Sequence, residues 1–415
     1  MKNTWQKYKL SDVVKINQNT LSKKDKLDSI VYLDTGNMIA GKISDLAEYA
    51  IEKAPSRAKR KVQHNSIVYS MVRPNQLHYG LIKNPKKNFI VSTGFAVIDC
   101  LTNIADSRFI YYWLTQSDIT EFLQGIAENS TSAYPAIRPE DLENLEIFLP
   151  PLDIQKKIAA VLGALDDKIE LNNKINSNLE QQAQALFKSW FVDFEPFGGK
   201  IPEDWEVGNL LDIADYLNGL AMQKFRPEEN EKGLPVLKIK ELRQGFCDAS
   251  SEFCSPNVKS EYIIDNGDVI FSWSGSLLVD FWCGGKCGLN QHLFKVTSEK
   301  FEKWFYYSWT KHYLNKFVAV AADKATTMGH IKRDELEKAE VVIPSSIDYQ
   351  KIGKVLSPIY DLIIQNRIEN TRLAAIRDAL LPKLMSGEID VSNVDISELP
   401  SADKSQLIED DSVKF

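Results

Sequence analysis

Residues 158–187 read IAAVLGALDDKIELNNKINSNLEQQAQALF, and residues 352–381 read IGKVLSPIYDLIIQNRIENTRLAAIRDALL. The second stretch lies 194 residues after the first, and at that shift residues 137–187 align with residues 331–381 without a gap. In both copies, apolar or asparagine residues recur at alternating steps of four and three, which is the heptad spacing of a coiled coil. The sequence therefore predicts one long helix present twice, as part of an internal repeat.

The positions that we expect to form the helix-pairing core are the same in both copies. They are Ile158, Leu162, Leu165, Ile169, Asn172, Asn176, Leu179, Ile352, Leu356, Ile359, Ile363, Asn366, Asn370 and Leu373. A core asparagine weakens a coiled coil but fixes its partner and register. If the helices pair antiparallel within the chain, the heptad midpoint Asn172 is expected to face Asn366. A plain core element or an oligomerisation stalk is the alternative, and the identical polar interruption favours pairing with each other.

Prolines mark the ends of these helices. Pro151 and Pro344 open the two segments, where a missing N–H costs least. In the second copy, Pro358 is expected to kink the helix and Pro382 to mark its end.

The repeat continues upstream of each helix. Trp5, Leu10 and Asp12 align with Trp205, Leu210 and Asp212 at a shift of 200, and the β-rich runs 66–70 and 268–272 are equivalent. We predict an α+β fold, with two similar mixed α/β domains separated by two long helices that pair as an antiparallel coiled coil. The expected boundaries are a first domain at 1–150, a helix at 151–190, a second domain at 191–344 with a linker at 191–203, a helix at 345–385 and an acidic, flexible tail at 386–415.

Composition bounds the class of protein. The 415 residues are 44% hydrophobic, as in a globular protein, and no stretch is long and apolar enough for a membrane span. The polar N-terminus and five cysteines favour a reducing cytoplasm. The net charge of −7 is unevenly distributed, because residues 1–100 carry seventeen Lys and Arg against eight Asp and Glu. Charge therefore favours DNA binding by the first domain and argues mildly against it for residues 200–300, where acids outnumber bases.

Side chains that can read DNA cluster after the predicted strand at 66–70. Arg pairs with guanine and Asn or Gln with adenine, whereas Lys, Arg and hydroxyl groups bind phosphates. The candidates in the first domain are Arg57, Lys59, Arg60, Lys61, Arg73, Asn75, Gln76, His78, Ser130, Thr131, Ser132 and Tyr134. A solvated surface is the alternative for the charge run at 57–61.

The second domain offers a different set in equivalent places. Its candidates are Lys238, Lys240, Arg243, Ser272, Trp273, Ser274, Ser276, Asn290, Gln291, His292, Thr326, Thr327, His330 and Lys332. A tryptophan beside a strand is more often core than a stacking platform for bases, which is the alternative for Trp273.

The sequence carries no signature of catalysis. A methyltransferase needs a glycine-rich cofactor loop and an Asn/Asp-Pro-Pro-aromatic motif, and a motor needs GxxxxGK[ST]; neither pattern occurs. Cys283, Cys287 and His292 do not have the spacing of a standard zinc site, so no metal is expected.

Several motifs resemble those of one known family. Residues 134–142, 149–152 and 155–158 look like the domain-to-helix junction of type I restriction specificity subunits, with Asp153 where the family usually has Glu. Residues 201–207 resemble the second-domain entry, and residues 384–389 the close of the second helix. Residues 270–276 with 289–292 are similar to one class of target-recognition domain, and residues 73–75 with 92–95 to another, which adds Ser92 and Thr93 to the DNA-binding candidates.

The resemblance implies a non-catalytic subunit. Its two target-recognition domains would each read one half of a split site on double-stranded DNA, while the paired helices hold them apart and dock two modification subunits. Those subunits would methylate adenine with S-adenosylmethionine, and motor-nuclease subunits would use ATP and Mg²⁺ to cleave unmodified DNA. A coiled-coil adaptor that does not touch DNA, or an enzyme with an unrecognised active site, are the alternatives.

Overall fold

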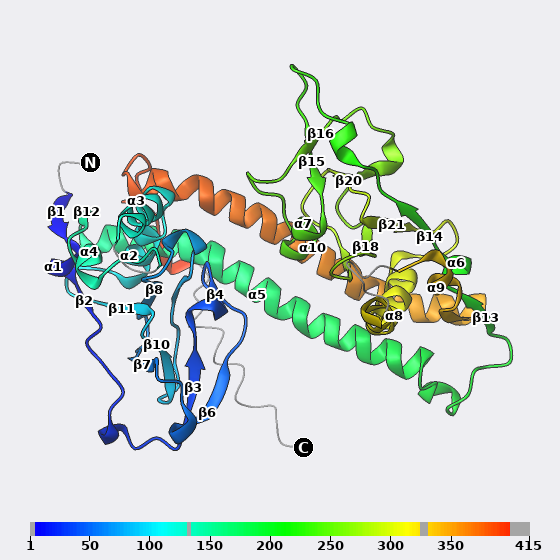
Figure 1. Ribbon diagram of the computed structural model, residues 1–415, viewed down its shortest axis with the longest axis horizontal. Helices are drawn as coiled ribbons and strands as arrows, with labels where there is room; N and C mark the ends of the chain where they lie inside the picture. Colours follow the sequence, from blue (N-terminus) through cyan, green and yellow to red (C-terminus); the bar gives the residue numbers. More distant parts are fainter. Residues whose placement is uncertain (1–4, 131–133, 324–330, 399–415) are drawn as a thin grey trace. The chain divides into compact units, whose positions relative to one another are not determined.

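The structure divides into two units that each contain one mixed domain. The computed structural model describes residues 5–130, 134–323 and 331–398. Of these residues, those up to Asp167 and those from Ala375 onward form the first unit, and Lys168–Ala374 form the second. The two long helices, α5 and α10, contribute to both units (Figure 1). The chain has the predicted α+β fold with an internal repeat.

The first domain is built from two four-stranded sheets and two strand pairs. The strand orders are β2-β11-β8-β9 and β6-β3-β10-β7, with β1 paired to β12 and β4 to β5. The strands are β1 (Gln6–Lys9), β2 (Val14–Ile16), β3 (Ser29–Leu33), β4 (Met38–Ile39), β5 (Lys42–Ile43), β6 (Ala47–Ala50), β7 (Ala58–Lys61), β8 (Ile67–Ser70), β9 (Tyr79–Leu81), β10 (Phe89–Ser92), β11 (Phe95–Cys100) and β12 (Glu146–Leu149). β8 is buried at all four positions, as its continuous apolar run requires.

The second domain repeats this topology. Its sheets have the orders β14-β21-β18-β19 and β16-β15-β20-β17, and β13 pairs with β22. In the second sheet of each domain, the two central strands run parallel and both outer strands run antiparallel to them. The strands are β13 (Glu206–Asn209), β14 (Asp215–Asn218), β15 (Leu234–Leu237), β16 (Phe253–Cys254), β17 (Ile263–Ile264), β18 (Val269–Ser272), β19 (Leu278–Phe281), β20 (Cys287–Leu289), β21 (Leu293–Thr297) and β22 (Glu340–Ile343).

Helices follow the same repeat. They are α1 (Leu10–Val13), α2 (Ser107–Leu114), α3 (Ser117–Glu128), α4 (Pro139–Glu143), α5 (Leu152–Phe191), α6 (Leu210–Ile213), α7 (Ile239–Gln244), α8 (Lys303–Asp323), α9 (Arg333–Glu337) and α10 (Ser346–Met385). α5 and α10 have 40 residues each and begin just after a strand of the small pair, β12 or β22.

The prolines in α10 do not interrupt it. α10 is continuous from Ser346 to Met385, so it passes Pro358 without a break and ends three residues after Pro382 rather than at it. The kink at Pro358 stays a prediction. Pro358 is exposed, so water can satisfy the carbonyl that its missing N–H leaves free. The helix ends at Gly387 with φ +71°, where Glu388 N–H donates to the Lys383 carbonyl at 2.9 Å and Gly387 N–H to the Leu384 carbonyl at 3.2 Å. This is a Schellman cap.

The helices pair antiparallel through their asparagines. In the second unit, Asn172 Nδ2 donates to Asn370 Oδ1 at 2.9 Å, and Asn366 Nδ2 donates to Asn176 Oδ1 at 2.8 Å. The prediction that Asn172 faces Asn366 is therefore wrong. Reversing one helix of a pair places each a position opposite a d position, whereas Asn172 and Asn366 are both d positions. The asparagines still bond one another across the core, although Asn172 Oδ1 is buried with no hydrogen-bond partner among the described residues.

The largest hydrophobic core of each domain includes the ends of the long helices. In the first unit, Ile158 and Leu162 of α5 pack with Leu384 of α10 and with the domain. In the second unit, Ile352, Leu356 and Ile363 of α10 pack with the second domain. The predicted helix-pairing positions near the start of each helix are thus part of a domain core as well.

Residues 386–398 also belong to the first core. Val391 is buried there, Ile389 and Val394 pack against it, and Gly387 lies against Trp5. The sequence assigned this segment to a flexible tail because of its charge, but its apolar residues anchor it. The rest of the predicted tail, residues 399–415, lies outside the described residues.

Candidate nucleic-acid interface

We call the sheet β2-β11-β8-β9 of the first domain, and its counterpart β14-β21-β18-β19 in the second, the principal sheet. In the first domain, four segments meet at one end of it. β8 ends at Ser70 and β11 starts at Phe95, so the residues after β8 lie beside those before β11. Met71 N–H donates to the Gly94 carbonyl at 2.9 Å, Ile137 N–H to the Met71 carbonyl at 2.8 Å and Thr93 N–H to the Arg57 carbonyl at 2.8 Å. These bonds bring residues 57, 71–76, 92–94 and 134–137 together, and we call this surface edge 1.

Several predicted residues are exposed on edge 1. Arg57, Arg73, Asn75, Gln76 and Tyr134 are exposed. The guanidinium carbon of Arg73 lies 5.9 Å from the centroid of the Tyr134 ring, within the range of a cation–π contact. Arg73 adopts φ +48°, and its N–H donates to the Pro135 carbonyl at 3.0 Å. The two segments therefore hold a basic and an aromatic side chain together at the surface.

Other predicted residues of the first domain have internal or paired roles. Ser92 is fully buried, so its side chain does not face solvent. Lys61 forms an ion pair with Asp25, and its hydrogen bond lowers the pKa of that carboxyl to about 2. Burial lowers the pKa of His78 and that of Arg60, both of which are half-buried. A neutral His78 can donate or accept one hydrogen bond but offers little charge to a phosphate.

The remaining candidates of the first domain lie in different settings. Lys59 is exposed on β7, Thr93 is half-buried, and the Ser130 hydroxyl accepts from Ala136 N–H at 3.4 Å. Thr131 and Ser132 lie outside the described residues.

The second domain has an equivalent surface, which we call edge 2. Trp273 N–H donates to the His292 carbonyl at 3.4 Å and Ile331 N–H to the Trp273 carbonyl at 2.9 Å. These bonds repeat those of Met71 in the first domain. Edge 2 comprises residues 272–276 and 290–292, together with Asn218 at the end of β14.

Polar contacts order edge 2. Ser274 Oγ and His292 Nδ1 are 2.9 Å apart, and the Trp273 indole donates to Asn218 Oδ1 at 3.0 Å. His292 is exposed, whereas Ser272, Ser274 and Asn290 are buried. Ser272 Oγ donates to the Ser276 carbonyl at 2.9 Å, and Asn290 Oδ1 accepts from His292 N–H at 3.3 Å. The buried members therefore shape the turns that present the exposed ones.

Two predicted lysines of the second domain are paired with carboxylates. Lys238 contacts Glu252 at 2.7 Å and Lys240 contacts Asp248 at 3.0 Å. Hydrogen bonds from Ser250 and then Lys240 lower the pKa of Asp248, and those pairs reduce the positive charge available to DNA. Arg243 and Lys332 are exposed, and Gln291 is half-buried. Thr326, Thr327 and His330 lie outside the described residues.

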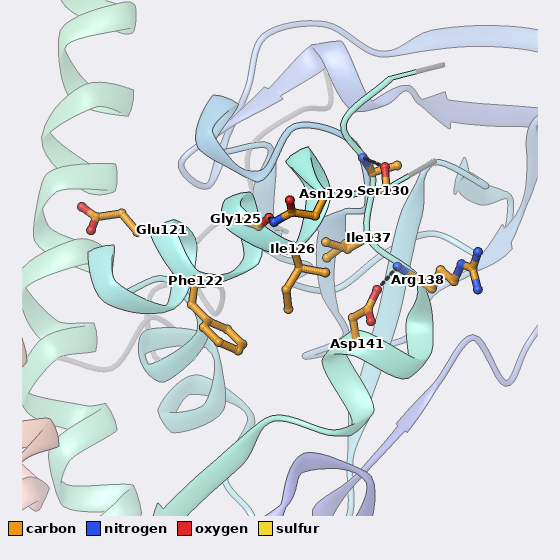
Figure 2. Close-up of a pocket in the computed structure, with 10 residues that line it drawn as sticks. Glu121, Phe122, Gly125, Ile126, Asn129, Ser130, Ile137, Arg138 and Asp141 are labelled. Atoms are coloured by element: carbon orange, nitrogen blue, oxygen red, sulfur yellow. Dashed lines mark hydrogen bonds between the residues drawn. The ribbon is translucent and has the colours of Figure 1, made fainter. Parts of the chain in front are cut away.

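A wide pocket of about 850 Å³ lies next to edge 1. Figure 2 shows its lining side chains, which come from α3 on one side and from the segment before and into α4 on the other. Its Asp141 carboxylate accepts from the Arg138 N–H at 2.7 Å as part of the α4 N-terminal cap. Phe122 is 57% exposed at its rim. The pocket therefore combines an apolar wall with two carboxylates, that of Asp141 in the α4 cap and that of Glu121 from α3.

Within residues 5–130, 134–323 and 331–398, no three His, Cys, Asp or Glu side chains are grouped to hold a metal ion. In that same part of the chain, no helix combines the length and apolar character needed to cross a membrane.

Sequence reasoning missed Asn218, which the structure adds to edge 2. The signal was available, because the shift of 200 that aligns Trp5 with Trp205 also aligns Gln18 with Asn218. Both side chains are exposed.

The fold and these edges define a class of protein: a tandem of two mixed domains on paired helices, with an ordered polar edge in each domain. Comparison with known proteins identifies the class further. The sequence model of the type I restriction modification DNA specificity domain matches residues 2–181 and 202–377, and the chain belongs to this family.

Relatives span most of the chain. It is 26% identical to the HindI specificity subunit of Haemophilus influenzae, over 93% of this chain and 99% of the relative. It is 33% identical to the MjaIX specificity subunit of Methanocaldococcus jannaschii, over 69% and 70% of the two chains. The crystal structure of the type I restriction-modification S subunit of M. genitalium has the same fold, with a TM-score of 0.53, 17% identity and coverage of 92% and 96%.

Proposed function

We propose that this chain is the sequence-specific DNA-binding specificity subunit of a type I restriction-modification complex and reads a bipartite, asymmetric site. The main support for this proposal is that edges 1 and 2 have the same backbone hydrogen bonds but different exposed side chains. A common backbone with different side chains is what two readers of unlike half-sites require, because base edges are distinguished by side-chain donors and acceptors.

The distribution of charge supports phosphate contact chiefly at the first domain. Arg57, Lys59 and Arg73 are exposed there, whereas Lys238 and Lys240 of the second domain are neutralised by acids. Phosphate contacts supply most of the sequence-independent affinity for DNA. We therefore expect edge 1 to contribute more non-specific affinity than edge 2.

Chemistry would reside in partner subunits. Two modification subunits would dock on the paired helices and methylate adenine with S-adenosylmethionine, and motor-nuclease subunits would use ATP and Mg²⁺. The chain itself would act in the cytoplasm as a non-catalytic subunit that selects the site.

The test is to co-express the chain with the modification subunit of its own system and to map methylated adenines in the host genome. We expect a motif of two unlike specified halves with an unspecified spacer. Methylation by this chain alone would favour an enzyme, and a complex that binds all sequences equally would favour an adaptor that does not read DNA.

A further inference from the structure

Each domain carries a carboxamide side chain two residues after an equivalent position of its first edge strand, in β14 at Asn218 and just beyond β2 at Gln18. β2 and β14 hold the same register, since Ile16 pairs with Ile98 and Tyr216 pairs with Val296. Ile98 of β11 and Val296 of β21 are also equivalent. Each pairs with the first residue of the next strand in its sheet, Ile67 of β8 or Val269 of β18. Two residues beyond Ile16 and Tyr216 stand Gln18 and Asn218.

Asn218 lies at the end of the sheet that forms edge 2, and Gln18 stands between Asn17, which bonds β11 at Val97, and Asn19, whose carbonyl accepts from Lys61 N–H at 3.0 Å. β14 runs antiparallel to β21, so Asn218 at its end pairs with Phe294 near the start of β21, next to His292. In the first domain, Asn17 N–H donates to the Val97 carbonyl at 2.8 Å and Asn17 Oδ1 accepts from Val97 N–H at 3.0 Å. Asn17 also has φ +57°, so the chain turns away from the sheet at this point and presents Gln18 to solvent.

The contact with Trp273 fixes the orientation of the Asn218 amide. An indole N–H can only donate, so the amide atom 3.0 Å from it is the oxygen, Oδ1. Oδ1 retains a second lone pair, and Nδ2 retains its hydrogens for a ligand. Trp273 is itself held against Phe294, with ring centroids 5.6 Å apart. Asn218 is therefore an exposed side chain whose acceptor and donor are held in a fixed orientation.

An acceptor and a donor side by side match one base edge in the major groove. Adenine presents the N6 amino donor beside the N7 acceptor, and Asn or Gln pairs with both. Guanine presents two acceptors there, so the carboxamide oxygen would face an acceptor and one hydrogen bond would be lost.

We infer that Gln18 and Asn218 are specificity-determining residues, each of which reads one adenine in the half-site of its own domain. This inference rests on the proposed function, because it requires each domain to face a half-site. Edge 1 exposes the arginines Arg57 and Arg73, whereas edge 2 carries the rings of Trp273 and His292. Since these side chains differ, we expect the carboxamide to read the base that the two half-sites have in common.

Isosteric acids test the inference. Asn218→Asp keeps an oxygen for the Trp273 indole but cannot donate to N7, and an acid accepts instead from the N4 amino group of cytosine. We expect Asn218→Asp to lower the preference for adenine at one position of the second half-site by about 5- to 150-fold. Gln18→Glu should do the same at one position of the first half-site. Each variant should leave the other half-site unchanged.

Matched controls carry the same charge change at the opposite end of the same sheets. Gln63→Glu lies before β8, and Asn266→Asp lies before β18, where its Oδ1 accepts from Gly285 N–H at 2.8 Å and an acid can still accept. Neither should alter base preference. The assay is competitive binding of the complete methyltransferase complex to duplexes with all four bases at each specified position, together with the methylated motif in cells.

The outcomes separate this inference from the proposed function. A single altered position in the matching half-site supports the inference. A split motif that is unchanged in Asn218→Asp, or affinity lost evenly at every position, overturns it and leaves the proposed function intact. A wild-type complex with no split-site preference overturns the proposed function instead.

Discussion

Replacing Asn176 by alanine tests whether the asparagine ladder holds the two helices in register. Asn176 is 5% exposed; its Oδ1 accepts from Asn366 at 2.8 Å and its Nδ2 donates to the Ile363 carbonyl at 3.2 Å. Alanine leaves the Asn366 amide buried without its acceptor. A buried group without a partner costs about 1–3 kcal/mol, and a further lost hydrogen bond costs about 1 kcal/mol. We expect Asn176→Ala to lower the free energy of unfolding of the second unit by about 3 kcal/mol.

Calorimetry of the full chain measures this effect. For a unit of this size, about 3 kcal/mol corresponds to a fall in Tm of roughly 6–12 °C. The control is Asn173→Ala: Asn173 is exposed and accepts from Asn370 at 2.9 Å, and water can replace that contact. We expect a loss of no more than about 0.5 kcal/mol there.

The double variant Asn176→Leu/Asn366→Leu separates stability from register. Removing both polar partners leaves no unsatisfied group, so stability should return to within about 1 kcal/mol of the wild type or exceed it. Register should then be less strictly defined, since only apolar contacts remain at that layer. The reasoning is refuted if Asn176→Ala is as mild as Asn173→Ala, or if the double variant is less stable than the single one.

Three further predictions concern the helices and the edges. Removing one heptad from both helices shortens the helix pair by ~10 Å, so the spacer of the methylated motif should shorten by about three base pairs with both halves unchanged; an unchanged spacer contradicts the role of the helices as a ruler. Burial raises the pKa of Asp167, but hydrogen bonds from Arg108 at 2.7 Å and Lys83 at 2.9 Å outweigh it and hold the pKa below its ordinary value. Asp167→Asn should therefore cost about 2 kcal/mol in urea unfolding at pH 7. Its difference from the wild type should shrink as the pH falls below about 4, because the carboxyl of the unfolded chain then becomes protonated and that of the folded chain follows at its lower pKa; a constant difference argues against the ion pair. Removing Arg57 should reduce the salt dependence of DNA binding by about one phosphate without changing the motif, whereas removing Arg73 should relax one position of the first half-site, and identical effects of the two would contradict these separate roles.

The sequence predicted the architecture because the same pattern of apolar and asparagine residues occurs in it twice. The heptad steps and the alignment of residues 137–187 with 331–381 predicted the two long helices, and the asparagines shared by both copies favoured pairing of the helices with each other. The expected antiparallel arrangement is the one that the structure has. The register was missed because a one-dimensional alignment matches Asn172 with Asn366, whereas geometry matches a with d positions. The steps of four and three already distinguish a from d positions, so the register follows from the sequence once the helices are taken as antiparallel.

The site was harder to predict because burial depends on neighbours that are distant in sequence. Ser92, Ser272 and Asn290 have the chemistry to bind DNA, but adjacent strands and turns cover them. The lysines at 238 and 240 look basic in sequence, and only the fold places Glu252 and Asp248 beside them. Gln18 and Asn218 were overlooked for the opposite reason: single amides attract no notice until strand register shows that the residues two positions before them, Ile16 and Tyr216, are equivalent.

The segment at 384–394 has a consequence for how the protein is made on the ribosome. Its Leu384 and Val391 complete a core that includes Leu10, whereas the second unit is one continuous stretch from Lys168 to Ala374. During translation, the later-encoded unit can thus finish folding while the earlier one still waits for its last part. A premature stop codon shortly before residue 384 would consequently destabilise the N-terminal domain and leave the second unit complete.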